Sequence, residues 1–150
     1  MDKPAETQDE HKDDPQAVAE RAAEAMYAND HAARELGITV DSIGPGTATL
    51  SMEVRPGMVN GHAIGHGGYT FTLADTAFAY ACNSYGDTTV AQRADISFVA
   101  PTYQGDRLRA EAVEQMKRGR NGIYDIRVTN QKGELVALFR GQSRVIAGRG

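Results

Sequence analysis

The segment "HGGYTFTLADTAFAYAC", residues 66–82, constrains the fold more than any other part of the chain. Nearly every residue after its two glycines is apolar or small. The pattern predicts a helix over about 69–83 that is apolar nearly all round, as is typical of a helix surrounded by protein. Small residues recur along it at i, i+3 and i+7, namely Ala74, Ala77 and Ala81. A sheet or a second helix can approach this stripe closely, so the domain must be built around this helix.

The segments on either side of this helix predict a sheet. Residues 38–56 read as two strands around a Gly-Pro-Gly turn, and the second strand alternates apolar residues on one face. Four more strands follow the helix, over 88–101, 106–118, 122–130 and 134–147, with glycine-containing turns between them. An antiparallel sheet of five to six strands wrapped around one helix satisfies this order with short connections, which is an α+β fold.

The N-terminal region predicts an extra helix after a polar tail. Asp14 is a plausible N-cap, Pro15 suits the first helical position, and Gly37 ends the helical pattern. Residues 1–14 are polar and charged, so we expect a disordered tail that is neither a signal nor a transit peptide. Residues 15–150 are of a length that suits a single domain.

Composition excludes several classes of function. The formal net charge of −4 implies no strongly basic face, so we expect no nucleic-acid partner. The apolar runs are too short to span a bilayer, so we expect no membrane partner. Cys82 is the only cysteine, which excludes an internal disulfide and favours a cytoplasmic protein with a free thiol.

One carboxylate, Asp75, stands in the middle of the apolar helix. An unpaired charge is costly there, so Asp75 either is a structural acid that caps another element or is a functional carboxylate in a partly dry cleft. Gly67 and Gly68 open the same helix, and their backbone N–H groups are expected to be unsatisfied donors at a positive dipole end. That is the geometry of an oxyanion hole, which favours the functional interpretation of Asp75.

Helix geometry separates these two groups within one chain. Asp75 lies eight residues beyond Gly67, which places it about 12 Å further along a helix that rises ~1.5 Å per residue. The two residues cannot both touch one carbonyl group of a substrate. If both are catalytic, they come from two subunits related by a two-fold axis, and each dimer has two sites.

Several motifs resemble one known family. The segments "NGHAIGHGGYTFTLADTAFAYACNS", "ISFVAPTYQGDRLRAEA" and "GIYDIRVTNQKGELVALFRGQSRVI" closely resemble the hot-dog-fold acyl-CoA thioesterases, most of all the phenylacetate-degradation (PaaI-type) thioesterases. The resemblance covers about 15–147. It implies a dimer whose sheets join edge to edge, commonly paired into a homotetramer, and hydrolysis of (hydroxy)phenylacetyl-CoA-type thioesters. It implies no cofactor, since coenzyme A is part of the substrate and product.

The resemblance also assigns site residues. The family aspartate falls on Asp75, the glycine whose N–H polarises the thioester carbonyl on Gly67, the loop asparagine on Asn60, and the histidine before the glycines on His66. Asp75 would act as a general base or as a direct nucleophile. Asn60 would donate to the carbonyl or orient water, or else support a loop turn. His66 would steady the thioester or the leaving sulfur, or else pack under the helix start.

Other residues are candidates for binding the substrate. Gly68 adjoins the oxyanion position, and the rings of Tyr69, Phe71 and Phe78 are candidate acyl-pocket walls or ordinary core. The turn "MKRGRNG" supplies three cations for the phosphates of coenzyme A, or merely a solvated face: Lys117, Arg118 and Arg120. Some relatives carry a Ser or Thr on the strand after the helix to hold water, where this chain has Ala91 and Gln92.

Two further groups have a plain interpretation. His62 and His66 have i, i+4 spacing, but the surrounding glycines argue against a helix there, so we expect no metal site. Cys82 lies about 10 Å beyond Asp75 on the helix and is expected to be a small buried hydrophobe.

The sequence leaves open three alternatives to an arylacetyl-CoA thioesterase. They are a thioesterase for medium-chain, long-chain or benzoyl esters, a hydratase or a dehydratase on the same fold, and a non-catalytic acyl-CoA-binding protein. Hydratase chemistry typically pairs a histidine with an acid, and an acyl-CoA-binding regulator usually carries a DNA-binding segment. The sequence shows no DNA-binding segment.

Overall fold

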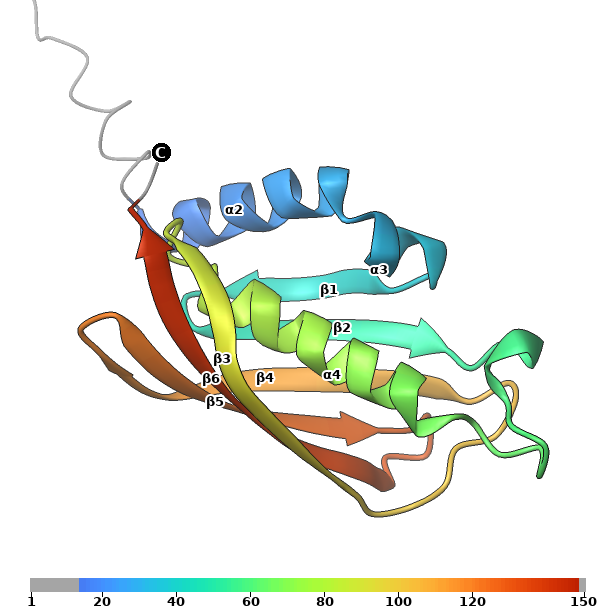
Figure 1. The fold of residues 1–150 in the computed structure, drawn as a ribbon. Helices are drawn as coiled ribbons and strands as arrows, with labels where there is room; N and C mark the ends of the chain where they lie inside the picture. Colours follow the sequence, from blue (N-terminus) through green and yellow to red (C-terminus); the bar gives the residue numbers. More distant parts are fainter. Residues whose placement is uncertain (1–13, 149–150) are drawn as a thin grey trace, which may run out of the picture.

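A computed structural model describes residues 14–148 of the chain, and the expected polar tail lies outside these residues except for Asp14. Six strands form one antiparallel sheet in the order β1-β2-β4-β5-β6-β3. The sheet curves around one long helix, α4, Gly67–Cys82 (Figure 1). The strands are β1 Thr39–Gly44, β2 Thr47–Glu53, β3 Thr88–Phe98, β4 Arg107–Arg118, β5 Asn121–Thr129 and β6 Leu135–Ala147. The predicted helix-in-sheet arrangement is therefore present, with strand boundaries within about three residues of those expected.

The small-residue stripe of α4 lets the sheet come close. Ala74, Ala77 and Ala81 are completely buried, and α4 packs against β2, β4 and β5. On β6, a Cβ added at Gly141 would lie 2.7 Å from the ring of Phe78, so only glycine allows that strand to pass over the ring. Burial on this scale is the main source of stability of the domain.

The single helix predicted over 14–37 is wrong, because the chain breaks at Asp30. The structure has α2, Pro15–Asn29, and a short α3, His31–Glu35. The Asp30 carboxylate accepts hydrogen bonds from the backbone N–H of Ala33 and the hydroxyl of Tyr80 on α4. An aspartate that caps a new helix offers the backbone an alternative to continuing the old one. Asp14 is the residue before α2, but its side chain makes no cap hydrogen bond.

The connection from β2 to α4 is a compact loop rather than an extended one. It begins with a 3-10 turn, Pro56–Met58, and returns on itself through a bridge between Val59 and Gly65. A second bridge joins Ile64 to Tyr103, in the segment between β3 and β4. The loop is therefore closed on itself and tied to the segment between β3 and β4 before the helix starts.

The two edges of the sheet differ. The helix α2 packs against β1, whereas β3 forms the other edge. Apolar side chains on β3 are exposed in the single chain, with Val90 42% and Phe98 57% exposed. A long edge strand with exposed apolar side chains is a template for pairing with another chain. No helix within residues 14–148 is long and apolar enough to cross a membrane.

Candidate active site

The start of α4 leaves one backbone donor free. The Nδ1 atom of His66 accepts a hydrogen bond from the N–H of Gly68 at 2.9 Å, and the N–H of Tyr69 donates to the His66 carbonyl. The N–H of Gly67 has no acceptor within the part of the chain that the structure describes. The expectation that both glycines offer free donors is thus wrong for Gly68, because His66 caps the helix.

The free donor lies on a firmly held backbone. The N–H of His66 donates to the Met58 carbonyl at 2.7 Å, and the N–H of Gly65 donates to the Thr102 carbonyl at 2.8 Å. Gly67 therefore has little freedom to move, and its N–H sits at the positive end of the α4 dipole. A preorganised donor at such a position is suited to stabilise negative charge on a carbonyl oxygen.

Asp75 lies in the middle of α4 and is half-buried. Its carboxylate makes no hydrogen bond or ion pair with any residue between 14 and 148, so it caps no other described element. Burial raises the pKa of the Asp75 carboxyl above its ordinary value of 3.8. A carboxylate that is partly desolvated and has no partner is more basic than one in water and is open to a ligand, which favours the functional interpretation.

Asn60 holds the turn before the helix. Its side-chain oxygen accepts from the backbone N–H of His62 at 2.9 Å and of Ile64 at 3.2 Å. The turn forces Ala63 to a φ of 61°, a left-handed conformation that is unfavourable for a residue with a side chain. Asn60 thus has the turn-supporting role considered above. Its amide group remains a donor that could serve a substrate.

A cavity of about 390 Å³ adjoins Gly67. It lies between the first turn of α4 and the segment that follows β3, and the ring of Phe98 closes one side. A Cβ added at Gly67 would lie 2.9 Å from that ring. Its other walls are Ile64, Gly65, Thr70, Val99, Ala100, Pro101, Thr102 and Val136.

A larger hollow of about 770 Å³ lies on the opposite face of the sheet from α4. Its lining mixes apolar and charged side chains, and it includes an ion pair between Arg140 and Asp125 with oxygen–nitrogen distances of 2.7 and 2.8 Å. Neither Gly67 nor Asp75 contributes to it. The smaller cavity is therefore the one that adjoins the free donor.

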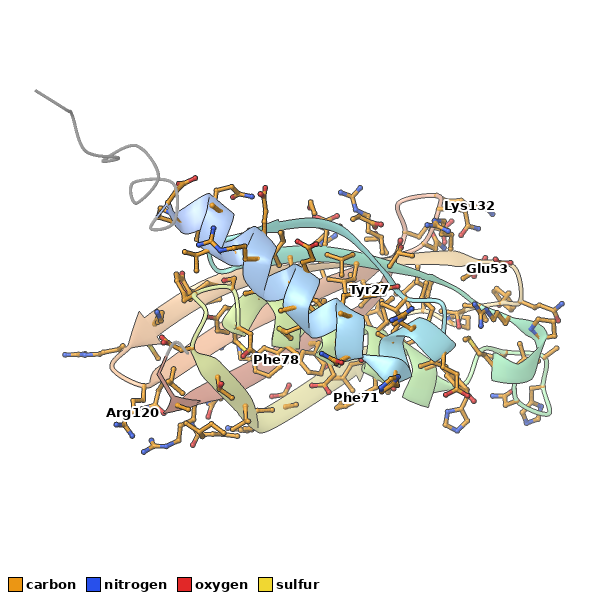
Figure 2. The ribbon with its side chains drawn as sticks, turned by 90° about the horizontal axis from the view of Figure 1, so that it is seen from above. Tyr27, Glu53, Phe71, Phe78, Arg120 and Lys132 are labelled. Carbon is orange, nitrogen blue, oxygen red and sulfur yellow. The ribbon has the colours of Figure 1, made fainter. Side chains whose placement is uncertain are left out.

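The aromatic candidates on α4 serve mainly as packing. Phe78 is buried, and Phe71 packs edge-on against Phe139 with ring centroids 5.3 Å apart. Figure 2 labels Phe71 and Phe78. Tyr69 is half-buried beside the His66 ring. None of these three rings lines the cavity at Gly67.

The cations of the β4–β5 turn lie far from Gly67 in the same chain. Figures 1 and 2 place this turn at the end of the sheet opposite the start of α4, with Arg120 at its tip. The Lys117 ammonium sits 3.6 Å from the centre of the Tyr85 ring. Binding of coenzyme A phosphates by this turn stays a prediction for Lys117, Arg118 and Arg120. Because the turn is far from Gly67 of its own chain, these cations would serve the site of another subunit.

The side chains of Gln92 and Cys82 have structural roles in this chain. The NH₂ group of Gln92 donates to the Asn121 side chain and to the Ser143 carbonyl, so these donors are not free to hold water as the Ser or Thr of some relatives does. Cys82 is buried, which raises the pKa of its thiol to about 12 and keeps it protonated and unreactive.

Comparisons with known proteins identify the family of the chain. The sequence pattern of the thioesterase superfamily matches residues 62–137, which include the loop, α4 and β3. The acyl-coenzyme A thioesterase PaaI of Escherichia coli K12 is 48% identical over 126 residues, 84% of this chain and 90% of that protein. The chain belongs to the thioesterase superfamily. Within it, the chain is similar to PaaI-type proteins.

Solved structures place the fold in the same family. The PaaI protein from the phenylacetic acid degradation operon of E. coli superposes with a TM-score of 0.87 at 47% identity, covering 88% of this chain and 96% of that one. A variant of the phenylacetic acid degradation protein PaaI from Thermus thermophilus superposes with a TM-score of 0.73 at 36% identity, covering 76% of this chain and 97% of that one. The hot-dog fold expected from the resemblance is confirmed.

The sequence did not reveal the cavity walls. Phe98 and Pro101 belong to the motif "FVAP" that carries the resemblance, yet nothing in the motif predicts that Phe98 contacts Gly67. That contact depends on how the end of β3 folds back beside the start of α4, and only the three-dimensional arrangement shows it.

Proposed function

We propose that this protein hydrolyses acyl-CoA thioesters of the (hydroxy)phenylacetyl type to the free acid and coenzyme A, as a step in aromatic-acid degradation. The observation that carries the proposal is a free N–H at Gly67 on the same helix as the unpartnered, half-buried carboxylate of Asp75. The similarity to an acyl-coenzyme A thioesterase supports the reaction class. The likeness to a protein from a phenylacetic acid degradation operon supports the acyl group. No cofactor is proposed.

The Gly67 N–H binds the thioester carbonyl oxygen in this proposal. As the carbonyl carbon is attacked, negative charge grows on that oxygen, and the N–H together with the helix dipole stabilises it. Such a donor is typically worth ~10²–10³-fold in kcat. Water is excluded from one side by Phe98, which packs against Gly67.

Asp75 of a second subunit supplies the base or nucleophile. On one helix the two groups stand about 12 Å apart, too far to serve one carbonyl. The free β3 edge, with its exposed apolar side chains, is where we place that subunit. Two routes remain. The carboxylate removes a proton from water as the water attacks the carbonyl, and the C–S bond then breaks to release the coenzyme A thiolate. Alternatively, the carboxylate attacks the carbonyl itself, which expels the thiolate and gives an anhydride that water then hydrolyses.

His66 and Asn60 assist from the loop. Because the Nδ1 atom of His66 accepts a hydrogen bond, any proton on the neutral ring is on Nε2, which is then a donor. That donor is suited to the leaving sulfur or to the carbonyl. Asn60 contributes the amide donor that its turn leaves free.

The raised pKa of Asp75 predicts the acidic limb of the pH profile. The reaction needs the carboxylate, so kcat/KM should fall as the pH drops through the pKa of Asp75, which lies above 3.8. Initial rates between about pH 3.5 and pH 8, with circular dichroism at each pH to monitor folding, measure this limb. A profile that stays flat down to pH 3.8 in folded protein would contradict the assignment.

The acyl preference is tested by direct comparison of substrates. We expect arylacetyl-CoA esters to be hydrolysed with kcat/KM at least about tenfold above that of long aliphatic esters. Release of coenzyme A can be followed with a thiol reagent, because Cys82 is buried and protonated and reacts slowly. A clear preference for long fatty acyl-CoA would reject this substrate class.

A further inference from the structure

Two threonine hydroxyls in the cavity beside Gly67 have no partner. Thr70, in the first turn of α4, is 3% exposed, and Thr102, after β3, is 4% exposed. Neither hydroxyl makes a hydrogen bond with any residue in 14–148, and neither is completely enclosed, so both reach the cavity. By contrast, the next two threonines of α4 donate to carbonyls within the helix. Each hydroxyl therefore belongs to a nearly buried side chain, has no partner among the described residues and is available to a polar group of a ligand in the cavity.

The remaining side chains of the cavity are apolar. The Phe98 ring closes it beside Gly67, and Ile64, Val99 and Val136 form much of the rest. An apolar cavity of ~150 Å³ can hold a benzene ring, so about 390 Å³ is enough for an arylacetyl group. Ring-on-ring contact with Phe98 would favour an aromatic acyl group over an aliphatic one.

Three backbone N–H groups along the cavity walls are already paired, whereas that of Gly67 is free. The N–H groups of Val99 and Ala100 both donate to the Val136 carbonyl, and the N–H of Gly65 donates to the Thr102 carbonyl. The pantetheine arm of coenzyme A carries amides that need such partners, and it must lead out to solvent. An apolar ring needs neither, so this cavity suits the acyl side of the thioester, and its paired walls keep a fixed shape.

We propose that Phe98, Thr70 and Thr102 determine the acyl specificity of this protein. The aryl ring of the substrate packs against Phe98 while the thioester carbonyl oxygen accepts from the Gly67 N–H. The two threonine hydroxyls bind a hydroxyl group on the aryl ring. This assignment rests on the proposed thioesterase function and adds the residues that select the acyl group.

The threonines are tested with near-isosteric variants. Thr70→Val and Thr102→Val should each lower kcat/KM for 3- or 4-hydroxyphenylacetyl-CoA by roughly three- to tenfold, the worth of one neutral hydrogen bond. The value for phenylacetyl-CoA should change less than about twofold, since that ring has no hydroxyl to bind. Thr70→Ser and Thr102→Ser keep the hydroxyl and should therefore retain the wild-type preference for the hydroxylated ester. Thr49→Val, on β2 away from the cavity, is the matched control.

Phe98 is tested by the ratio of two acyl classes. Phe98→Ala should lower kcat/KM for phenylacetyl-CoA about tenfold and that for hexanoyl-CoA by less than about threefold. The matched control is Tyr103→Ala, since Tyr103 is 53% exposed and does not line the cavity. Size-exclusion chromatography checks that each variant keeps the assembly of the wild type.

The outcomes separate this inference from the function it rests on. An equal loss on every CoA ester would place the pantetheine arm in the cavity and overturn the inference. A loss explained by dissociation of subunits would also overturn it, because Phe98 would then be an interface residue only. A wild-type protein that hydrolyses no CoA ester rejects the proposed function itself, and the inference falls with it.

Discussion

Asp75→Asn is expected to lower kcat for thioester hydrolysis by ~10²–10⁴-fold, the usual worth of a positioned general base. The amide has nearly the shape of the carboxylate but neither takes a proton nor attacks a carbonyl. KM should change little, because Asp75 is proposed to act on water or on the carbonyl carbon rather than to hold coenzyme A. Initial rates on phenylacetyl-CoA at saturation measure the effect.

The same substitution should make the protein slightly more stable. Burial raises the pKa of the Asp75 carboxyl in the folded state above its ordinary value of 3.8. A group shifted in this direction favours the fold when protonated, and this contribution is lost as the pH rises through the folded pKa. At neutral pH the charged carboxylate is therefore unfavourable. Asp75→Asn should raise Tm by about 1–2 °C at pH 7, a modest gain because the group is only half-buried.

Stability and activity therefore move in opposite directions, which distinguishes a functional acid from a structural one. Removing a structural acid that caps another element would lower Tm. The gain should shrink as the pH falls toward 3.8, where the wild-type carboxyl is itself protonated. An Asn variant that keeps near wild-type kcat on every CoA ester tried would show that Asp75 is not catalytic.

The architecture was readable from the sequence because it depends on local patterns. The apolar helix, the strand alternation and the glycine turns each appear within a short window, and short connections leave few ways to combine them. The break at Asp30 was not readable. It depends on a hydrogen bond from Tyr80, fifty residues away, and no local pattern shows that contact.

The site was readable only in part. The glycines and the acid stand out in the sequence because they are unusual on an apolar helix. That His66 takes up the Gly68 donor and leaves Gly67 free depends on the side-chain conformation at the helix start. The sequence does not distinguish Thr70 and Thr102 from their neighbours. Only the three-dimensional structure shows that their hydroxyls face the cavity without a hydrogen-bond partner among the described residues.

If the active site is divided between two chains, mixing two inactive variants should restore activity. This test needs a variant that removes only the Gly67 N–H. Gly67→Pro does so at a position that accepts proline. Gly67 is the first residue of α4, and the residue before it, His66, has the extended backbone that proline requires. Its N–H makes no hydrogen bond in the described chain, so none is lost. The new side chain would press on the Phe98 ring, which is half-exposed and can shift.

Gly67→Ala is the matched control for that contact. Its Cβ meets Phe98 in the same way, but its N–H remains. The difference in kcat between the Ala and Pro variants therefore measures the contribution of the backbone N–H at position 67. We expect this difference to be ~10²–10³-fold. Equal activities of the Ala and Pro variants would show that the N–H does not polarise the carbonyl. Circular dichroism and chromatography of each homodimer establish first that both are folded and assembled.

Mixing the Asp75→Asn and Gly67→Pro chains should then restore activity that neither has alone. In a mixed dimer, one site combines both lesions and the other combines the intact Gly67 of one chain with the intact Asp75 of its partner. Random exchange makes about half of the dimers mixed, each with one working site, so roughly a quarter of wild-type activity should return. Two chains that both carry Asp75→Asn are the negative control. If folded, freely exchanged mixtures stay inactive, Gly67 and Asp75 do not meet across a subunit boundary. The carboxylate would then need another reason to lie unpartnered on a buried helix.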